Sequence, residues 1–309
     1  MNQRVRGILV VLLSASLWGL SGTAAQVLFT RGFSPMFLVA VRLWGAAVIL
    51  LLAVYLRHPA SLRVDRRSLG QLAVFGLFGF FLVQYSYFAA IAAAGVATAT
   101  FLQYLGPALI VLYAAIARRR LPSPAEAGAV LLAVCGTGLL VLGGGPLRVT
   151  SAGLLFGLLS AVSLAFYTIY PATLVQRLGP WTTSGYGFLF GALAATLFYA
   201  ATPHRMPPLT VQDLALTLFV VLFGTLIAFA IYVSALRHLS PSEIGIAATG
   251  EPLSAAASAY FLLGQALQGW QYAGGALIVI AVAVLALFGR TPAARVERTG
   301  VIAGGRPDP

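Results

Sequence analysis

Apolar segments long enough to cross a membrane follow one another along almost the whole chain. A transmembrane helix needs about 20 mainly apolar residues to span a hydrocarbon core of ~30 Å. Only 8% of the 309 residues are charged, whereas an average soluble domain has about 25%. The pattern excludes a soluble fold and predicts an all-α integral membrane protein with ten transmembrane helices, at residues 7–29, 35–56, 69–92, 96–117, 125–143, 151–175, 182–201, 213–236, 242–263 and 270–289.

Arginine supplies every positive charge, since all 19 Lys+Arg residues are arginine. A net charge of +12 could indicate a nucleic-acid partner in a soluble protein. Here the arginines cluster in short segments between apolar spans, so no nucleic-acid partner is predicted. With a cytoplasmic N-terminus, fifteen of the 19 fall on the cytoplasmic side. Together with an alanine- and glycine-rich, lysine-free composition, this predicts a multi-pass protein of a bacterial cytoplasmic (inner) membrane with both termini cytoplasmic.

Two smaller features concern the first segment and the single cysteine. The first segment is too long for a signal-peptide core, so we expect it to be retained as a helix. Cys135 cannot form an intramolecular disulfide, because the chain has no second cysteine. It lies in the apolar run LLAVCGTGLL, where we expect it to be a buried small hydrophobic residue.

The chain contains an internal repeat. Placing Pro107 over Pro252, an offset of 145 residues, aligns the two halves without a gap from Gly79 and Gly224 onward. Five spans is an odd number, so the second copy must enter the membrane from the opposite side. Inverted repeats are frequent in secondary transporters, with the substrate site near the midplane between the repeats. The predicted units are two inverted five-helix repeats, at 1–146 and 147–290, followed by a disordered cytoplasmic tail at 291–309.

Several motifs resemble those of a known family. They are Trp18-Gly19, Arg42 in LVAVRLWGAAVIL, and the stretch HLSPSEIGIAATGEPLSAAASAYFLLGQALQGWQYAGGALIVIAVAVL. With ten spans in two halves, residues 7–290 resemble the drug/metabolite transporter superfamily, in particular its EamA-type members. The resemblance implies an inner-membrane carrier of small organic solutes, often amino acids or related metabolites and often exported, with a central cavity built from both halves.

The sequence departs from the pattern of that family at three places. Gly106-Pro107 stands where the first half would have Glu-Pro. The arginines at 118–120 replace the Gly-Glu pair that closes the fourth span, and the corresponding pair in the second half reads Gly264-Gln265.

Glu251 and Arg42 are the two ionisable residues well inside the predicted spans. A charge at a helix centre costs about 2.5 to 3.5 kcal/mol on the insertion scale, so each should face protein or a wet cavity. Glu251 follows Ser240 by eleven residues, which places it about 16 Å into its helix. It could take up a proton, bind the amine of a substrate, or serve as a structural hydrogen-bonding carboxyl beside Pro252. We predict helix breaks at Pro107 and Pro252.

Arg42 has three candidate roles, whereas Glu243 has a structural one. Arg42 lies about 12 Å from the outer membrane edge; it could snorkel, bind an anionic group, or pair with Glu251. Glu243 follows Ser240 and Pro241 in the pattern of a capping box, so we predict a helix cap and no chemistry.

Uncharged polar residues in the spans are weaker candidates for substrate contact, because buried amides and phenols most often bond neighbouring helices. They are Trp18, Gln26, Gln84, Tyr87, Gln103, Tyr104 and Tyr167. The three histidines fall in or beside loops, so neither a metal site nor a cofactor is predicted. The run from Gly143 to Pro146 lacks a following Lys-Ser/Thr, so it is predicted to be a turn and not a phosphate loop.

Two functions fit these features. The first is a secondary transporter that works by alternating access on a small-molecule substrate, with protons as one candidate coupling ion. The alternative is a non-transporting membrane sensor or scaffold, which would need a sizeable soluble appendage. An enzyme is not predicted, because no Ser/His, paired-Asp or His-Glu-x-x-His arrangement lies within the spans.

Overall fold

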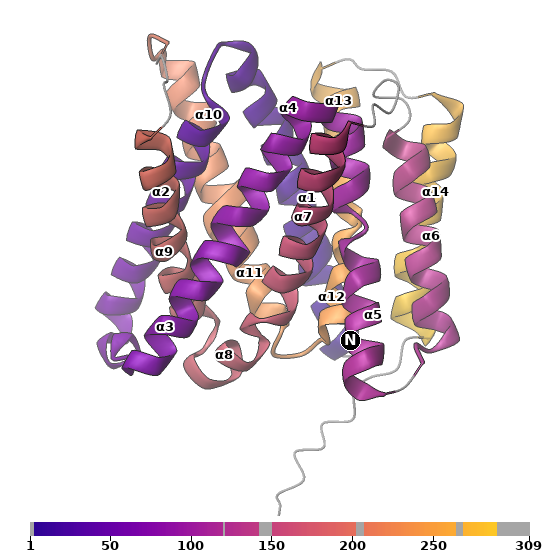
Figure 1. Ribbon diagram of the computed structural model, residues 1–309, viewed down its shortest axis with the longest axis horizontal. Helices are drawn as coiled ribbons and strands as arrows, with labels where there is room; N and C mark the ends of the chain where they lie inside the picture. Colours follow the sequence, from indigo (N-terminus) through magenta and orange to yellow (C-terminus); the bar gives the residue numbers. More distant parts are fainter. Residues whose placement is uncertain (1–2, 120, 142–149, 202–206, 264–267, 289–309) are drawn as a thin grey trace, which may run out of the picture.

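The protein is a bundle of long helices packed side by side (Figure 1). The computed structural model describes residues 3–119, 121–141, 150–201, 207–263 and 268–288, and within these ranges it contains helices and no strand. The first half comprises α1 (Gln3–Thr30), α2 (Pro35–Arg57), the short η1 (Pro59–Leu62), α3 (Arg66–Val74), η2 (Phe75–Phe81), α4 (Leu82–Gln103), α5 (Gly106–Arg118) and α6 (Pro124–Val141). The second half comprises α7 (Ser151–Ile169), α8 (Pro171–Leu178), α9 (Pro180–Ala200), α10 (Val211–Val221), η4 (Leu222–Ile227), α11 (Ala228–Ala235), α12 (Pro241–Ala248), α13 (Gly250–Leu263) and α14 (Gly269–Phe288).

Seven helical stretches within the described residues are long and apolar enough to cross a membrane, and the shorter apolar helix Pro124–Leu139 accompanies them. The seven are Arg4–Thr30, Pro35–Arg57, Arg66–Ile91, Ala99–Ala117, Ser151–Leu178, Val211–Ala235 and Gly269–Phe288. The predicted fold class, an all-α multi-pass membrane protein, is therefore confirmed. The segments predicted at 182–201 and 242–263 are also helical but fall outside this set, so the count of ten spans stays a prediction.

The predicted span 151–175 is divided at Tyr170 into α7 and α8, and two further predicted spans are interrupted. We expected a loop between residues 92 and 96, but α4 continues through this stretch and ends in a turn at Tyr104 and Leu105. The segment 242–263 is likewise divided at Thr249 into α12 and α13. A proline follows each of the latter two breaks, Pro107 in one case and Pro252 in the other, because proline lacks an N–H and fits only the first turn of a new helix.

Local sequence signals set where the helices begin. Ser240 with Glu243 and Thr210 with Asp213 form complete capping boxes at the starts of α12 and α10. The predicted cap at Glu243 is thus confirmed. Asp65 caps α3 by accepting a hydrogen bond from the Ser68 amide, and its interaction with Ser68 lowers the pKa of this carboxyl.

The helices of the two halves begin at corresponding positions. α2 starts at residue 35 and α9 at 180, α3 at 66 and α10 at 211, and α6 at 124 and α14 at 269, so each pair is separated by 145 residues. Each half also contains one π-helical segment, η2 in the first and η4 in the second, within the third helix of its half. These segments are uncommon and occur mostly at functional sites.

The main interhelical contacts join one half to the other. α1 packs on α13 and α11, α2 on α9, α4 on α7, and α6 on α14. Small residues allow the close approaches. A Cβ added to Gly19 of α1 would lie 2.6 Å from the Ala255 backbone nitrogen of α13, and one added to Gly136 of α6 would lie 2.7 Å from the Gly274 carbonyl oxygen of α14.

The prediction that Cys135 is buried was wrong, because its side chain is exposed. Its neighbours Gly136 and Thr137 are buried, and Gly136 faces α14. Cys135 consequently points away from that interface. The predicted turn at 143–146, the Gly264-Gln265 pair and the tail at 291–309 lie outside the described residues.

Candidate functional site

The two helix breaks come together inside the bundle. α12, which ends at the second break, packs against α5, which begins after the first. The contact is close, since a Cβ added to Gly245 would lie 2.7 Å from Ile110 Cδ1 and 3.6 Å from the Pro107 Cα. At a break the backbone groups lose their intrahelical partners and can face a cavity, an arrangement typical of transporter substrate sites.

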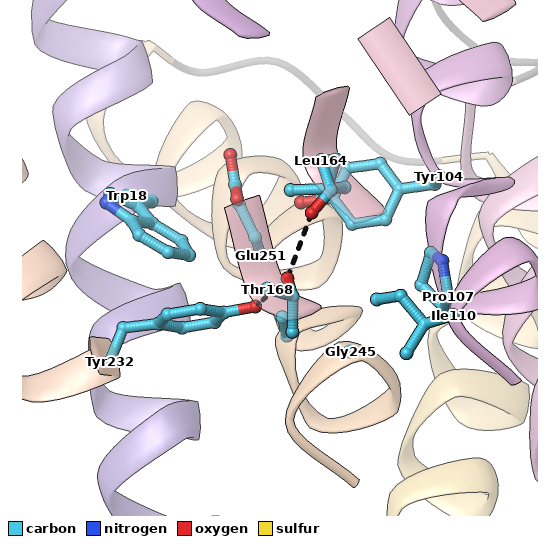
Figure 2. A pocket seen from close by; sticks show the side chains of 10 residues that line it. Trp18, Tyr104, Pro107, Ile110, Leu164, Thr168, Tyr232, Gly245 and Glu251 are labelled. Atoms are coloured by element: carbon cyan, nitrogen blue, oxygen red, sulfur yellow. Dashed lines mark hydrogen bonds between the residues drawn. The ribbon is translucent and has the colours of Figure 1, made fainter. Parts of the chain in front are cut away.

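A small cavity, with room for about one water molecule, lies beside these breaks (Figure 2). Side chains from both halves of the chain line it. They are Trp18, Tyr104, Pro107, Ile110, Leu164, Thr168, Tyr232, Gly245, Ala248 and Glu251. Four of the residues singled out in the sequence, Trp18, Tyr104, Pro107 and Glu251, are therefore in the lining.

Glu251 supplies the carboxylate of this cavity. It is the second residue of α13, directly after the break at Thr249, so the positive end of the helix dipole lies nearby. Its side chain projects between Trp18 and Tyr104 (Figure 2). It interacts with the Tyr104 hydroxyl and, electrostatically, with Arg42. The sequence placed a carboxylate deep in the membrane, and the structure shows a cavity beside it.

Aromatic rings form one wall of the cavity. The Trp18 ring lies 5.0 Å from the Tyr232 ring and 4.7 Å from that of Phe229 between centroids. Tyr232 also stacks on Tyr167 at 5.3 Å, and its hydroxyl shares a 2.9 Å hydrogen bond with Thr168. These contacts fix the orientation of the Trp18 and Tyr232 rings with respect to the carboxylate.

Arg42 lies outside the cavity lining. Its Nε donates to the Thr225 hydroxyl at 2.8 Å and its Nη2 to the Gly224 carbonyl at 3.0 Å. Its guanidinium also lies 5.9 Å from the centroid of the Phe229 ring. Both acceptors belong to the π-helical segment η4. No ion pair joins Arg42 to Glu251 in the described part of the chain, although the two charges attract each other over a longer distance.

The remaining sequence candidates make contacts within the bundle. The Tyr87 hydroxyl bonds to that of Thr100 at 2.9 Å and lies within electrostatic range of Glu251. Gln103 Nε2 donates to the Ser160 hydroxyl on α7. Gln84 Nε2 donates to the Phe80 carbonyl one turn earlier.

Three more candidates stand apart from the cavity lining. Tyr167 is fully buried among aromatic rings, and its hydroxyl has no hydrogen-bond partner among the described residues. Pro252 is buried in the first turn of α13. Gln26 is exposed on α1.

Sequence reasoning missed some of the residues at this site. Tyr232 was not a candidate, although the 145-residue repeat pairs it with Tyr87, which was; the repeat could have identified it. Thr168, Leu164 and Ile110 carry no comparable signal, since each is an ordinary residue of an apolar segment. No group of three or more His, Cys, Asp or Glu side chains that could hold a metal occurs in the described ranges.

Two ion pairs connect the ends of α1 to the second half. Arg4 Nε donates to Glu243 at 2.6 Å, and both side chains are buried. Arg4 also donates to the carbonyls of Ala286 and Leu285 in the last turn of α14. At the other end, Arg31 pairs with Asp213 at 2.6 Å. Both carboxylates belong to capping boxes. The sequence indicated Arg4 only as a topology signal, but it is buried in the bundle.

Comparison with known proteins gives one consistent result. The EamA-like transporter family model matches residues 5–142 and again 151–287. The chain is 33% identical over 295 residues to the uncharacterized inner membrane transporter YicL of Salmonella typhimurium, covering 94% of this chain and 98% of that protein. It is 27% identical over 281 residues to the uncharacterized transporter YwfM of Bacillus subtilis, covering 90% and 92%. A protein of known crystal structure has the same fold, with a TM-score of 0.78 and 23% sequence identity over 93% of this chain and 98% of the other.

Proposed function

The chain belongs to the EamA-like transporter family, and from this premise we propose that it is a secondary transporter that exports small organic metabolites such as amino acids by alternating access. The proposed location is the bacterial inner membrane, in keeping with the Salmonella relative. The first turn of α1 contacts the last turn of α14 through Arg4, so these two helices begin and end on the same side. The arginine distribution favours the cytoplasm as that side.

The observation that carries the proposal is the position of Glu251. A carboxylate of the second half stands at a helix break, in a cavity lined by both halves, and interacts with Tyr104 and Arg42 of the first half. A charged group inside a membrane is costly and marks a functional site by default. It has two candidate roles here, recognition of the solute and coupling to protons.

The arrangement of helices supports an inverted repeat. Helices that begin 145 residues apart, α2 with α9 and α6 with α14, pack directly on each other. Such self-pairing is expected of elements beside a pseudo-two-fold axis. In Figure 1, α3 lies toward one end of the bundle and α10 toward the opposite end. Two five-helix repeats, 1–146 and 147–290, that rock against each other would expose the cavity to each side of the membrane in turn.

Solute flux in proteoliposomes tests this proposal. Purified protein is reconstituted, and the release of radiolabelled amino acids and amines is followed with and without a pH gradient. Glu251→Gln, which keeps the shape and removes the charge, should abolish the flux. Glu126→Gln at the start of α6 is the matched control. One oxygen of the Glu126 side chain accepts hydrogen bonds from the Ser123 amide and hydroxyl, outside the cavity, and the amide oxygen of glutamine can accept the same bonds.

The results distinguish the roles and the alternative. Flux that depends on the pH gradient in the native protein but not in Glu251→Gln indicates proton coupling. Flux by Glu251→Gln equal to that of the native protein at every pH contradicts both roles of Glu251. A sealed protein with no flux of any solute favours the sensor or scaffold alternative.

A further inference from the structure

We propose that the cavity recognises an organic ammonium group, held by the Glu251 carboxylate between the rings of Trp18, Tyr104 and Tyr232. This inference deepens the proposed function and rests on it for the claim that the bound molecule is transported. It narrows the small organic metabolites of that proposal to amines that carry a single positive charge and an apolar remainder, in place of free amino acids.

The first argument is the chemistry of the lining. Among its ten residues, one is ionisable, Glu251, and three are aromatic. A carboxylate accepts hydrogen bonds from an ammonium group, and charge-assisted bonds of this kind are the strong ones. Aromatic faces attract cations through the ring quadrupole, most strongly where water is excluded. Figure 2 shows Trp18 and Tyr104 approaching Glu251 from opposite sides, with Tyr232 below it.

The second argument is that the aromatic wall is already held in place. Trp18 and Tyr232 pack on each other and on Phe229 and Tyr167. The Tyr232 hydroxyl is bonded to Thr168. Rings that need no reordering when a ligand binds give up less conformational entropy, which favours affinity.

The third argument separates amines from free amino acids. A zwitterion would need a cationic or strongly donating partner for its carboxylate, and the described cavity lining contains no arginine or histidine. Arg42 is within electrostatic range of Glu251 but lies outside the lining, and its Nε and Nη2 donate to Thr225 and Gly224. Burying a carboxylate without a partner is unfavourable.

The apolar remainder of the ligand has a surface to lie against. Pro107 and Ile110 line the cavity across from Trp18 and Tyr232, and Leu164 lies beside Tyr104 (Figure 2). The cavity leaves about 20 Å³ for the centre of a water-sized molecule, which is room for about one water, so the ligand enters as the two repeats move apart.

Three probes that share a phenethyl skeleton test the inference: phenethylamine, phenylalanine and phenethyl alcohol. They share the phenyl ring and differ in charge, being a cation, a zwitterion and a neutral molecule. Binding to the full-length protein in nanodiscs is measured by isothermal titration calorimetry. We expect phenethylamine to bind at least about tenfold more tightly than either of the others, because only it can use the carboxylate without burying an unpaired charge.

Variants locate the binding at this cavity. Glu251→Gln should weaken phenethylamine binding at least about tenfold, and Trp18→Leu should weaken it by removing the cation–π contact. Glu126→Gln should bind as the native protein does. Size-exclusion profiles and thermal unfolding show whether each variant is folded. If Trp18→Leu fails to fold, the test uses Glu251→Gln alone. This variant is expected to fold, because glutamine is isosteric with glutamate.

Three results would overturn the inference. They are no binding of phenethylamine, binding of phenylalanine or the alcohol at least as tight as that of the amine, and native affinity in folded Glu251→Gln. The measurement needs no transport, so its failure is distinguishable from failure of the proposed function. A protein that binds the amine at Glu251 but moves no solute would refute transport, whereas one that exports phenylalanine without binding the amine would refute this inference.

Discussion

The buried ion pair between Arg4 and Glu243 offers the most direct test of how the bundle is held together. Their exposed fractions are 8% and 2%, and their N and O atoms lie 2.6 Å apart. Arg4 also donates to two carbonyls of α14. Removing one member of a buried pair leaves an uncompensated charge and costs about 3–5 kcal/mol. We expect Arg4→Met to destabilise the protein by this amount, since Glu243 would keep only its cap bonds to Ser240.

The reverse substitution should cost less. Glu243→Gln leaves one acceptor oxygen where the carboxylate had two, Oε1 for Arg4 and Oε2 for the Ser240 cap, but the α14 carbonyls still accept from Arg4. Its expected cost is therefore that of a weakened charge-assisted bond, about 1.5–3 kcal/mol. In the double variant the two costs should not add, because the unpaired Glu243 charge of Arg4→Met is gone. The coupling energy should lie in the range of about 0.5–3 kcal/mol found for residues in contact.

The assay is unfolding in mixed micelles with a rising fraction of denaturing detergent, followed by far-UV circular dichroism. Arg6→Met is the matched control, because it makes the same change two residues away at an exposed position. It should alter the free energy of unfolding by no more than about 0.5 kcal/mol. The reasoning is refuted if Arg4→Met and Arg6→Met have the same stability, or if the two single costs add in the double variant.

Two further substitutions test the packing and the Arg42 site. Gly19→Ala should destabilise the contact of α1 with α13, because the added Cβ would lie 2.6 Å from a backbone atom. Gly22→Ala on the same helix is the control: its Cβ would have nothing within 4 Å, so it should be neutral or stabilising by up to about 1 kcal/mol. Equal thermal unfolding midpoints of the two variants would contradict this. Arg42→Lys should reduce flux in proteoliposomes, because a lysine ammonium cannot reproduce the two hydrogen bonds that the guanidinium donates to the Thr225 hydroxyl and the Gly224 carbonyl of η4. Native flux in this variant would show that these two hydrogen bonds are dispensable.

The sequence predicted the class of fold well, because the bilayer imposes a simple rule on it. Backbone groups in lipid must be paired within a helix, so long apolar runs are sufficient to identify spans. Sequence also identified Glu251 as a deep carboxylate beside a proline and Glu243 as a cap. In each case the signal is local: a charge in an apolar run, or a Ser-Pro-x-Glu pattern at the start of a helix.

The partners of these residues could not be predicted. Arg4 lies 239 residues from Glu243, and Arg42 reaches Thr225 in the other half of the chain. Lipid is as apolar as the helix interior, so a transmembrane helix needs no polar outer face that would reveal which side is packed. The same reason explains the wrong prediction for Cys135. It also explains why apolar lining residues such as Leu164 carried no sequence signal.

The asymmetry between the two halves has a steric basis. The repeat places Gly106 opposite Glu251, and the two follow equivalent helix breaks. A Cβ at Gly106 would lie 2.9 Å from Leu164 Cδ2 and 3.3 Å from the Ala161 carbonyl oxygen on α7. A side chain there would have to push aside the Leu164 side chain and crowd the Ala161 carbonyl of α7, the helix that contributes Leu164 and Thr168 to the cavity lining. The first half therefore brings its break close to α7 and supplies Tyr104 and Pro107, and the second half supplies the acid. This packing accommodates one carboxylate, that of Glu251, among lining residues from both repeats.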